Sequence, residues 1–240
     1  MKRFYKTVST VSANGGFSVC LDGRPILTPG RARLIVPTAA LAEAVAAEWE
    51  EQTEEINPAA MGLTRLVNSA LDRAAAAPGA ILDQVMAYVD TDLVCYRSDE
   101  PPDLAAAQAA AWDPVVAWAE RRFDIHLALT TALLPQAQSP AVHQALRAAV
   151  AARQTMALAA LGAMTQASGS LLVALAVAEG ALAAEPAWRA VRVDERWQAS
   201  RWGEDAEATR LEQGQWREFS DCVRFLDLLR PSPAAPQSAA

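Results

Sequence analysis

The side chains best suited to chemistry or recognition lie near the C-terminus, in residues 194–204, which read DERWQASRWGE. We predict a helix here, and on a helix Glu195, Gln198 and Trp202 share one face at i, i+3 and i+7. A carboxylate, an amide and an indole side by side suit binding to another protein, because aromatic residues are enriched at interface cores. The alternative is a core tryptophan beneath a solvated charged face, which the spacing alone favours.

A second candidate is Asp92, in the segment Tyr88–Arg97 with the sequence YVDTDLVCYR. On a predicted helix Asp92 lies four residues from both Tyr88 and Tyr96, within reach of both hydroxyls. A buried carboxylate with a raised pKa can act as a general acid, so an enzyme using Asp92 in a helical cleft is the alternative function. Buried acids are more often hydrogen-bonded structural nodes, because an unpaired buried charge is costly. We expect that structural role for Asp92.

Other signatures of catalysis and cofactor binding are absent from the sequence. It contains no P-loop, no GxSxG and no HExxH motif. The cysteines (Cys20, Cys95 and Cys222) and the histidines (His126 and His143) are widely separated, and no CxxC pair occurs. We therefore expect no catalytic nucleophile, metal, cofactor or small-molecule substrate, and a reducing compartment.

Composition limits the partners and the location. The chain has 240 residues, 52% of them hydrophobic, and a formal charge of −7, which argues against nucleic acid or an anionic membrane as partner. The uncharged run 154–178 is broken by polar and small residues at 165–170, which predicts two buried helices and no membrane span. The N-terminus lacks the apolar core of a signal peptide, so we predict no signal peptide.

The N-terminal third of the chain predicts a small β-rich domain with a packed helix, over residues 1–77. The predicted strands are Phe4–Val11, Phe17–Leu21, Ile26–Thr28 and Arg33–Val36. A turn signal at Asn14-Gly15-Gly16 separates the first two strands, and Thr38 is the predicted N-cap of the helix. Trp49 falls on the apolar stripe of this helix, and we predict that it is a structural residue anchoring the helix on the sheet.

Residues 78–230 predict a larger all-helical domain, which makes the fold class α+β. Trp112-Asp113-Pro114 indicates the start of a new helix, and Gly203 is predicted to separate the last two helices. The C-terminal residues 231–240, PSPAAPQSAA, have little to bury and are predicted to be a disordered tail.

Six segments are informative when they are taken in order: FYKTV at Phe4–Val8, LDGRPILTP at Leu21–Pro29, VPTAALAEAVAAEWEEQ at Val36–Gln52, YVDTDLVCYR at Tyr88–Arg97, WDPVVAW at Trp112–Trp118 and RWGE at Arg201–Glu204. Together they resemble one protein family, the "ATP-twelve" assembly chaperones that attend the α subunit of ATP synthase. Each motif alone is weak, and their shared order over nearly the whole chain is specific.

The resemblance implies a chaperone that binds the unassembled F-one α subunit and prevents its aggregation until the β subunit replaces it. It implies a bacterial cytoplasmic protein, whose eukaryotic relatives lie in the mitochondrial matrix, and no requirement for ATP. The family's acidic segment before the Trp-Gly pair falls on Asp194 and Glu195, and Glu204 follows that pair. The predicted partner-binding residues are Asp194, Glu195, Gln198, Trp202 and Glu204. A scaffold whose acidic helices only confer solubility is a further alternative.

Overall fold

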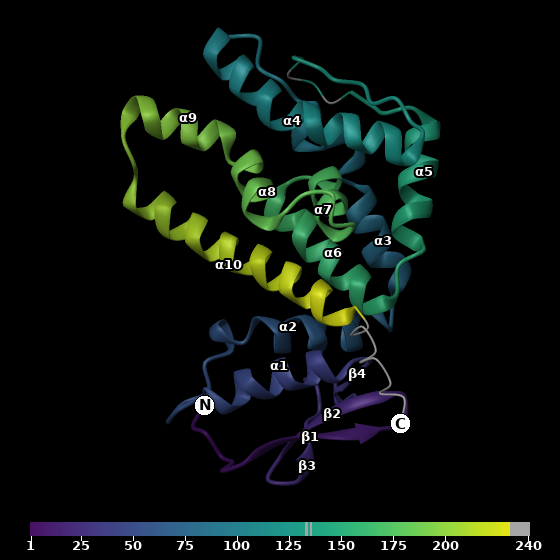
Figure 1. The fold of residues 1–240 in the computed structure, drawn as a ribbon, viewed down its shortest axis with the longest axis vertical. Helices are drawn as coiled ribbons and strands as arrows, with labels where there is room; N and C mark the ends of the chain where they lie inside the picture. Colours follow the sequence, from purple (N-terminus) through teal and green to yellow (C-terminus); the bar gives the residue numbers. More distant parts are fainter. Residues whose placement is uncertain (133, 135, 231–240) are drawn as a thin grey trace, which may run out of the picture. The chain divides into compact units, whose positions relative to one another are not determined.

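The computed structural model describes residues 1–132, 134 and 136–230. These residues form two compact units (Figure 1). The first contains Met1–Ala77, Thr155–Ala160 and the described chain from Arg224, and the second contains Pro78–Gln154 and Leu161–Val223. A small antiparallel sheet near the N-terminus is followed by helices, which confirms the α+β class. The predicted disordered tail at 231–240 lies outside the described residues.

The sheet is antiparallel throughout and is built around its second strand. Its strands are β1 (Val8–Ala13), β2 (Gly16–Leu21), β3 (Arg24–Pro25) and β4 (Ile35–Val36). Strand β2 pairs with β1 on one side and with β3 and β4 on the other. Gly16 has a φ of 152°, and a Cβ atom there would lie 2.1 Å from the carbonyl oxygen of Val36, so only glycine fits this turn. Strand β3 begins earlier than predicted, because pairing with β2 resumes directly after the turn at Asp22-Gly23.

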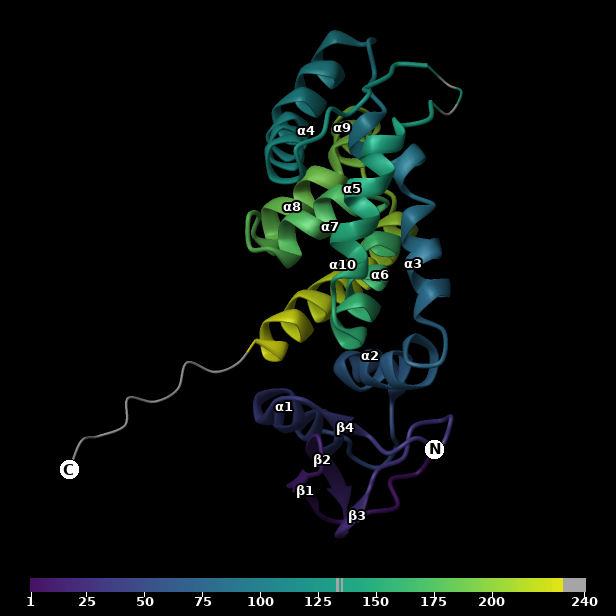
Figure 2. The ribbon, with the colours of Figure 1, turned by 90° about the vertical axis from the view of Figure 1, so that its right-hand side faces the viewer.

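Helix α1 (Ala39–Glu50) packs on this sheet, with Leu41 and Val45 buried (Figures 1 and 2). The predicted N-cap is confirmed, since the Thr38 hydroxyl accepts a hydrogen bond from the backbone N–H of Leu41. Trp49 is half-buried, and its ring lies 5.7 Å from that of Tyr5 in the segment before β1. The rest of this unit holds η1 (Pro58–Ala60), α2 (Gly62–Ser69) and a π-helical turn, η2 (Ala70–Ala74).

The second unit is helical. Its elements are α3 (Pro78–Met86), η3 (Val89–Thr91), η4 (Leu93–Cys95), α4 (Pro102–Phe123), α5 (Pro140–Ala151), α6 (Thr155–Ser168), α7 (Leu171–Ala178), α8 (Ala184–Val191), α9 (Val193–Trp202) and α10 (Ala206–Leu229), with α6 and α10 each contributing residues to both units. Helix α7 is the core of this unit, because every residue from Leu171 to Val177 is buried.

The uncharged run forms two helices as predicted, α6 and α7, joined at Gly169 with a φ of 69°. Among the described residues, no helix has both the length and the apolar character needed to cross a bilayer.

The predicted helix start at Trp112-Asp113-Pro114 is wrong. Helix α4 runs without a break through Pro114, which lies in its interior. An interior proline costs about 3 kcal/mol through the lost hydrogen bond and a steric clash. Burial of Trp112, Val115 and Ala119 on the same helix offsets that cost.

Candidate functional site

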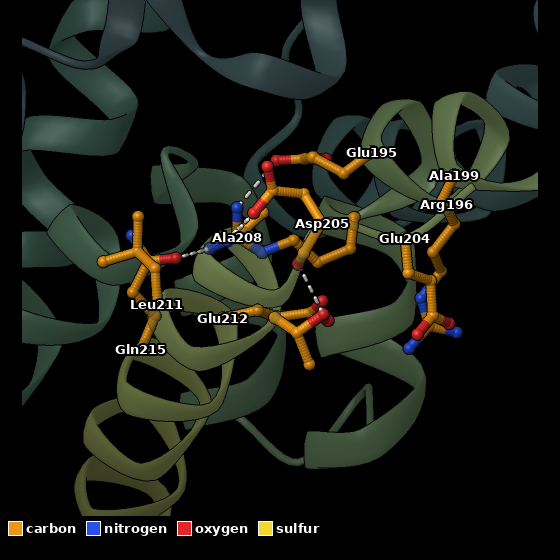
Figure 3. A pocket seen from close by; sticks show the side chains of 11 residues that line it. Glu195, Arg196, Ala199, Glu204, Asp205, Ala208, Leu211, Glu212 and Gln215 are labelled. Atoms are coloured by element: carbon orange, nitrogen blue, oxygen red, sulfur yellow. Dashed lines mark hydrogen bonds and ion pairs between the residues drawn. The ribbon is translucent and has the colours of Figure 1, made fainter. Parts of the chain in front are cut away.

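Helices α9 and α10 flank a groove of about 530 Å³ (Figure 3). Gly203, with a φ of 90°, ends α9, and the short linker to α10 closes one end of this hairpin. The groove is lined by Arg192, Glu195, Arg196, Ala199, Glu204, Asp205, Ala208, Thr209, Leu211, Glu212 and Gln215. We call it the α9–α10 groove.

Some charged side chains of the groove have hydrogen-bond or ion-pair partners within the protein, and others do not. Glu195 pairs with Arg192 at 2.7 Å, and Arg192 also donates to the side-chain oxygen of Gln215 at 2.5 Å. Asp205 accepts from the backbone N–H groups of Glu207 and Ala208, and these hydrogen bonds lower the pKa of its exposed carboxyl group.

By contrast, Glu204 and Glu212 have no hydrogen-bond or ion-pair partner within the described part of the chain. Their carboxylates are therefore available to a cationic group from outside, whereas Glu195 is already neutralised by Arg192.

The groove also offers apolar surface. Ala199 and Ala208 lie on its walls, and Leu211 is 64% exposed. An exposed leucine in the same groove as two available carboxylates suits an amphipathic segment that carries a basic side chain. The arrangement has the features of a binding surface.

The structure divides the predicted partner-binding residues among different surroundings. Glu195 and Glu204 line the groove, whereas Gln198 is exposed outside its lining. Trp202 is 74% exposed, and its ring lies 5.6 Å from that of Trp197, in an edge-to-face contact. The helix predicted for this segment is confirmed by α9, but Glu195 and Trp202 do not meet in the groove.

Asp194 points toward α4. Its carboxylate accepts a hydrogen bond of 2.7 Å from the side-chain amide of Gln108, a buried residue on α4. The indole N–H of Trp197 likewise donates to Asp103 at the start of α4, and Arg201 forms an ion pair with the same carboxylate. These contacts fix the side of α9 that faces away from the groove.

Sequence reasoning missed Arg192, Leu211 and Glu212. Leu211 lies 11 residues before the buried Cys222, so helical spacing places it on the apolar side of α10 and gives no signal that its side chain is exposed. Glu212 carries no signal either, because a glutamate on an exposed helix is ordinary.

The helix predicted around Asp92 is wrong. Asp92 lies between η3 and η4 in an extended conformation, and the hydroxyl of Tyr96 donates to the backbone carbonyl of Asp90. The predicted helix through Tyr88 and Tyr96 does not form because α3 already ends at Met86. The carboxylate of Asp92 is buried and hydrogen-bonded, as a structural node would be.

Three groups donate to the Asp92 carboxylate. They are the Ser170 hydroxyl at 2.6 Å, the backbone N–H of Leu172 at 3.0 Å and that of Val94 at 3.3 Å. Asp92 thus caps the N-terminus of α7, where the helix dipole favours a negative charge. Burial outweighs these hydrogen bonds and raises the pKa of Asp92 to about 6.

Known structures show which proteins share this architecture. The crystal structure of Atp12 from Paracoccus denitrificans has a TM-score of 0.90 and 40% sequence identity, covering 95% of this chain and 98% of that chain. The chain belongs to the ATP12 chaperone family. A family model described as ATP12 chaperone protein matches residues 2–120. The family predicted from the ordered motifs is therefore confirmed.

Two further similar proteins extend the comparison. The crystal structure of a protein from Agrobacterium tumefaciens that is described as a chaperone has a TM-score of 0.92 at 36% identity, over 95% of this chain and 86% of that chain. A Schizosaccharomyces pombe protein named "Protein atp12, mitochondrial" is 25% identical over 219 residues, which is 85% of this chain and 75% of that protein. The ATP12 family is described as chaperones, which points away from an enzyme. The α9–α10 groove lies beyond the residues matched by the family model.

Proposed function

We propose that this ATP12-family protein assists ATP synthase assembly by binding the unassembled F-one α subunit through the α9–α10 groove. It holds this client in the bacterial cytoplasm and prevents its aggregation until the β subunit replaces it. The observation that carries the proposal is a mostly charged and polar groove that contains the exposed Leu211, together with Glu204 and Glu212, two carboxylates without partners among the described residues.

An assembly chaperone needs an interface strong enough to cover the client and weak enough to be displaced. An isolated α subunit exposes the surface that β later covers, which contains both apolar and charged groups. An exposed leucine supplies apolar contact area, while carboxylates at the edge pair with basic side chains and fix the register. Such mixed interfaces bind with modest affinity and exchange readily.

The enzyme alternative finds no support in the surroundings of Asp92. Its carboxylate is fully buried and accepts hydrogen bonds from three donors, so it presents no free atom to a substrate. Its hydrogen bonds at the start of α7 support a structural role.

Co-expression with the cognate α subunit in the absence of β tests the proposal. We expect soluble α to co-purify with this protein, and the β subunit, expressed as control client, to gain little solubility. Glu204→Lys and Glu195→Lys are expected to reduce the recovered α several-fold while the variants remain folded. Glu207→Lys makes the same charge change on α10 outside the groove and is expected to leave recovery unchanged.

Insoluble α with wild-type protein, or equal rescue of α and β, would contradict a dedicated α-subunit chaperone. Equal losses from Glu204→Lys and Glu207→Lys would show that net charge matters and the groove does not.

A further inference from the structure

The outer edge of strand β1 is open. Within the described residues, β2 is the only strand that pairs with β1. All four residues from Ser9 to Ser12 are exposed, and the sequence VSTVSA contains no charge and no proline. Exposed edges of this kind are normally blocked by charges, prolines or bulges, because they accept further strands.

The sheet's register shows which backbone groups point outward. Thr7 lies opposite Asp22 as a hydrogen-bonded pair, since the N–H of Asp22 donates to the carbonyl of Thr7 at 3.0 Å. Antiparallel pairs alternate, so Val8, Thr10 and Ser12 belong to the pairs that make no hydrogen bond with β2.

An independent contact on the far side of β2 confirms this assignment. Val19, which lies opposite Thr10, accepts a hydrogen bond of 2.9 Å from Ile26, on the other side of the sheet. The N–H and C=O groups of Thr10 therefore point away from β2, as do those of Val8 and Ser12.

The opposite side of the sheet is protected. Strand β3 consists of Arg24 and Pro25, a charged residue and a proline, and β4 is two residues long and is followed by Pro37. Both are recognised devices against strand addition. The sheet thus blocks one side and leaves the six residues of β1 open on the other.

We propose that β1 binds an extended segment of the client chain, which adds to the sheet as an antiparallel or parallel neighbour. The identity of the client rests on the proposed function above. The contact would use the outward N–H and C=O groups of Val8, Thr10 and Ser12, which repeat about every 6.8 Å, the two-residue repeat of a β-strand.

The outward N–H and C=O groups of β1 are suited to bind an extended chain, because donors and acceptors that alternate at this spacing match those of another strand. A second copy of this protein is a poor occupant. A strand of six residues is about 20 Å long, and pairing along that strip alone falls well short of the roughly 1,200 Å² that stable protein interfaces bury. A client that is also bound at the α9–α10 groove keeps its extended segment at a raised effective concentration near β1, and this strengthens the contact with the strand.

The test uses the full chain with Thr10→Pro, and Thr10→Ala as its matched control. Proline removes the outward N–H and leaves the β1–β2 hydrogen bonds intact, whereas alanine keeps the N–H and removes only the exposed side chain. Urea unfolding and circular dichroism establish that both variants fold. We expect Thr10→Pro to weaken binding of the α subunit about fivefold to tenfold, with Thr10→Ala at the wild-type level.

Two further measurements separate this inference from the proposed function. Amide hydrogen exchange with and without the α subunit should show new protection at Val8, Thr10 and Ser12. Twelve-residue peptides spanning the α subunit should include some that bind wild type and fail to bind Thr10→Pro.

Each outcome decides one or both proposals. If α binds wild type and Thr10→Pro equally, without new protection in β1, the open edge has no role and the proposed function stands. If intact α does not bind but peptides bind in a Thr10→Pro-sensitive way, the edge stands and the proposed function falls. If neither α nor any peptide binds, both are overturned. Concentration-dependent dimerisation that Thr10→Pro abolishes would make a second copy the occupant and overturn the inference.

Discussion

The buried amide of Gln108 bridges the carboxylate of Asp194 on α9 and the backbone of Ser98. Its nitrogen donates to Asp194 at 2.7 Å, and its oxygen accepts from the N–H of Ser98, also at 2.7 Å. Gln108 is only 2% exposed, and apart from Asp194 its nitrogen has only a long contact of 3.5 Å to the Ser98 hydroxyl. Asp194 therefore helps to hold α9 in place, whereas Glu204 and Glu212 are the groove carboxylates that have no partner among the described residues.

Asp194→Ala is expected to lower the free energy of unfolding by about 1–3 kcal/mol, because it leaves the buried Gln108 donor without its partner. Urea denaturation measures this change. Glu195→Ala on the same helix removes an exposed ion pair and is expected to cost under about 1 kcal/mol. A loss of α-subunit binding by Asp194→Ala without a loss of stability would instead place Asp194 in the interface.

Asp92 makes stability depend on pH. Its pKa is raised by burial from 3.8 to about 6, so between these values the folded protein binds more protons than the unfolded chain. The contribution of Asp92 is therefore greatest below about pH 4 and is lost as the pH rises through about 6, by roughly 3 kcal/mol. We expect the stability of wild type relative to Asp92→Asn to fall over this range in urea denaturation.

Ser170→Ala is the control for that experiment, because it keeps the Asp92 carboxylate and removes one hydrogen-bond donor. Loss of this donor raises the pKa of Asp92 further, so the decline should extend to higher pH. A constant difference between wild type and Asp92→Asn from pH 4 to 7 would refute the raised pKa.

Glu48 stabilises the start of α2. Its carboxylate accepts hydrogen bonds from the backbone N–H groups of Leu63 and Thr64 and from the Thr64 hydroxyl, at 2.7–2.8 Å. Glutamine supplies one acceptor oxygen and turns an amide toward a donor, so Glu48→Gln is expected to cost about 2–3 kcal/mol. Glu43→Gln, an exposed change on the same helix, should stay within about 0.5 kcal/mol. Equal unfolding midpoints for the two variants would contradict this role.

Salt should weaken binding of the α subunit if Glu204 and Glu212 pair with its basic side chains. We expect the affinity to fall as the salt concentration rises from about 50 to about 300 mM, since exposed charge pairs are screened. Titration calorimetry should give a smaller salt dependence for Glu204→Gln, and Glu207→Gln should behave as wild type. A scaffold without client preference would show neither effect.

Local patterns predicted much of the fold because they act over a few residues. The Asn-Gly-Gly turn, the Thr38 cap and the Gly203 break each fix the backbone through their own conformational preferences. The prediction failed at Pro114 and around Asp92, where distant packing decides the outcome. Packing of the buried side chains of α4 keeps this helix continuous through Pro114. The hydroxyl of Ser170, which is distant from Asp92 in the sequence, donates a hydrogen bond to the Asp92 carboxylate.

Less of the candidate site than of the fold could be predicted from the sequence. A helical wheel groups Glu195 with Trp202, but it does not reveal that Trp197 attracts the Trp202 ring or that α10 supplies the other wall. Glu212 lines the groove because the chain turns after Gly203 and α10 lies beside α9. The spacing of residues within α9 cannot predict this turn.

Helix α9 contributes no buried residue, in contrast to the wholly apolar interior of α7. It is held by hydrogen bonds and ion pairs and by half-buried side chains such as Val193 and Trp197, so its opening exposes less hydrophobic area than an opening of α7 would. We expect the free energy of such an opening to lie below that of global unfolding. The groove therefore has one wall that is able to reorder while the core stays folded, and under the proposed function the β subunit would release the client by loosening this single helix.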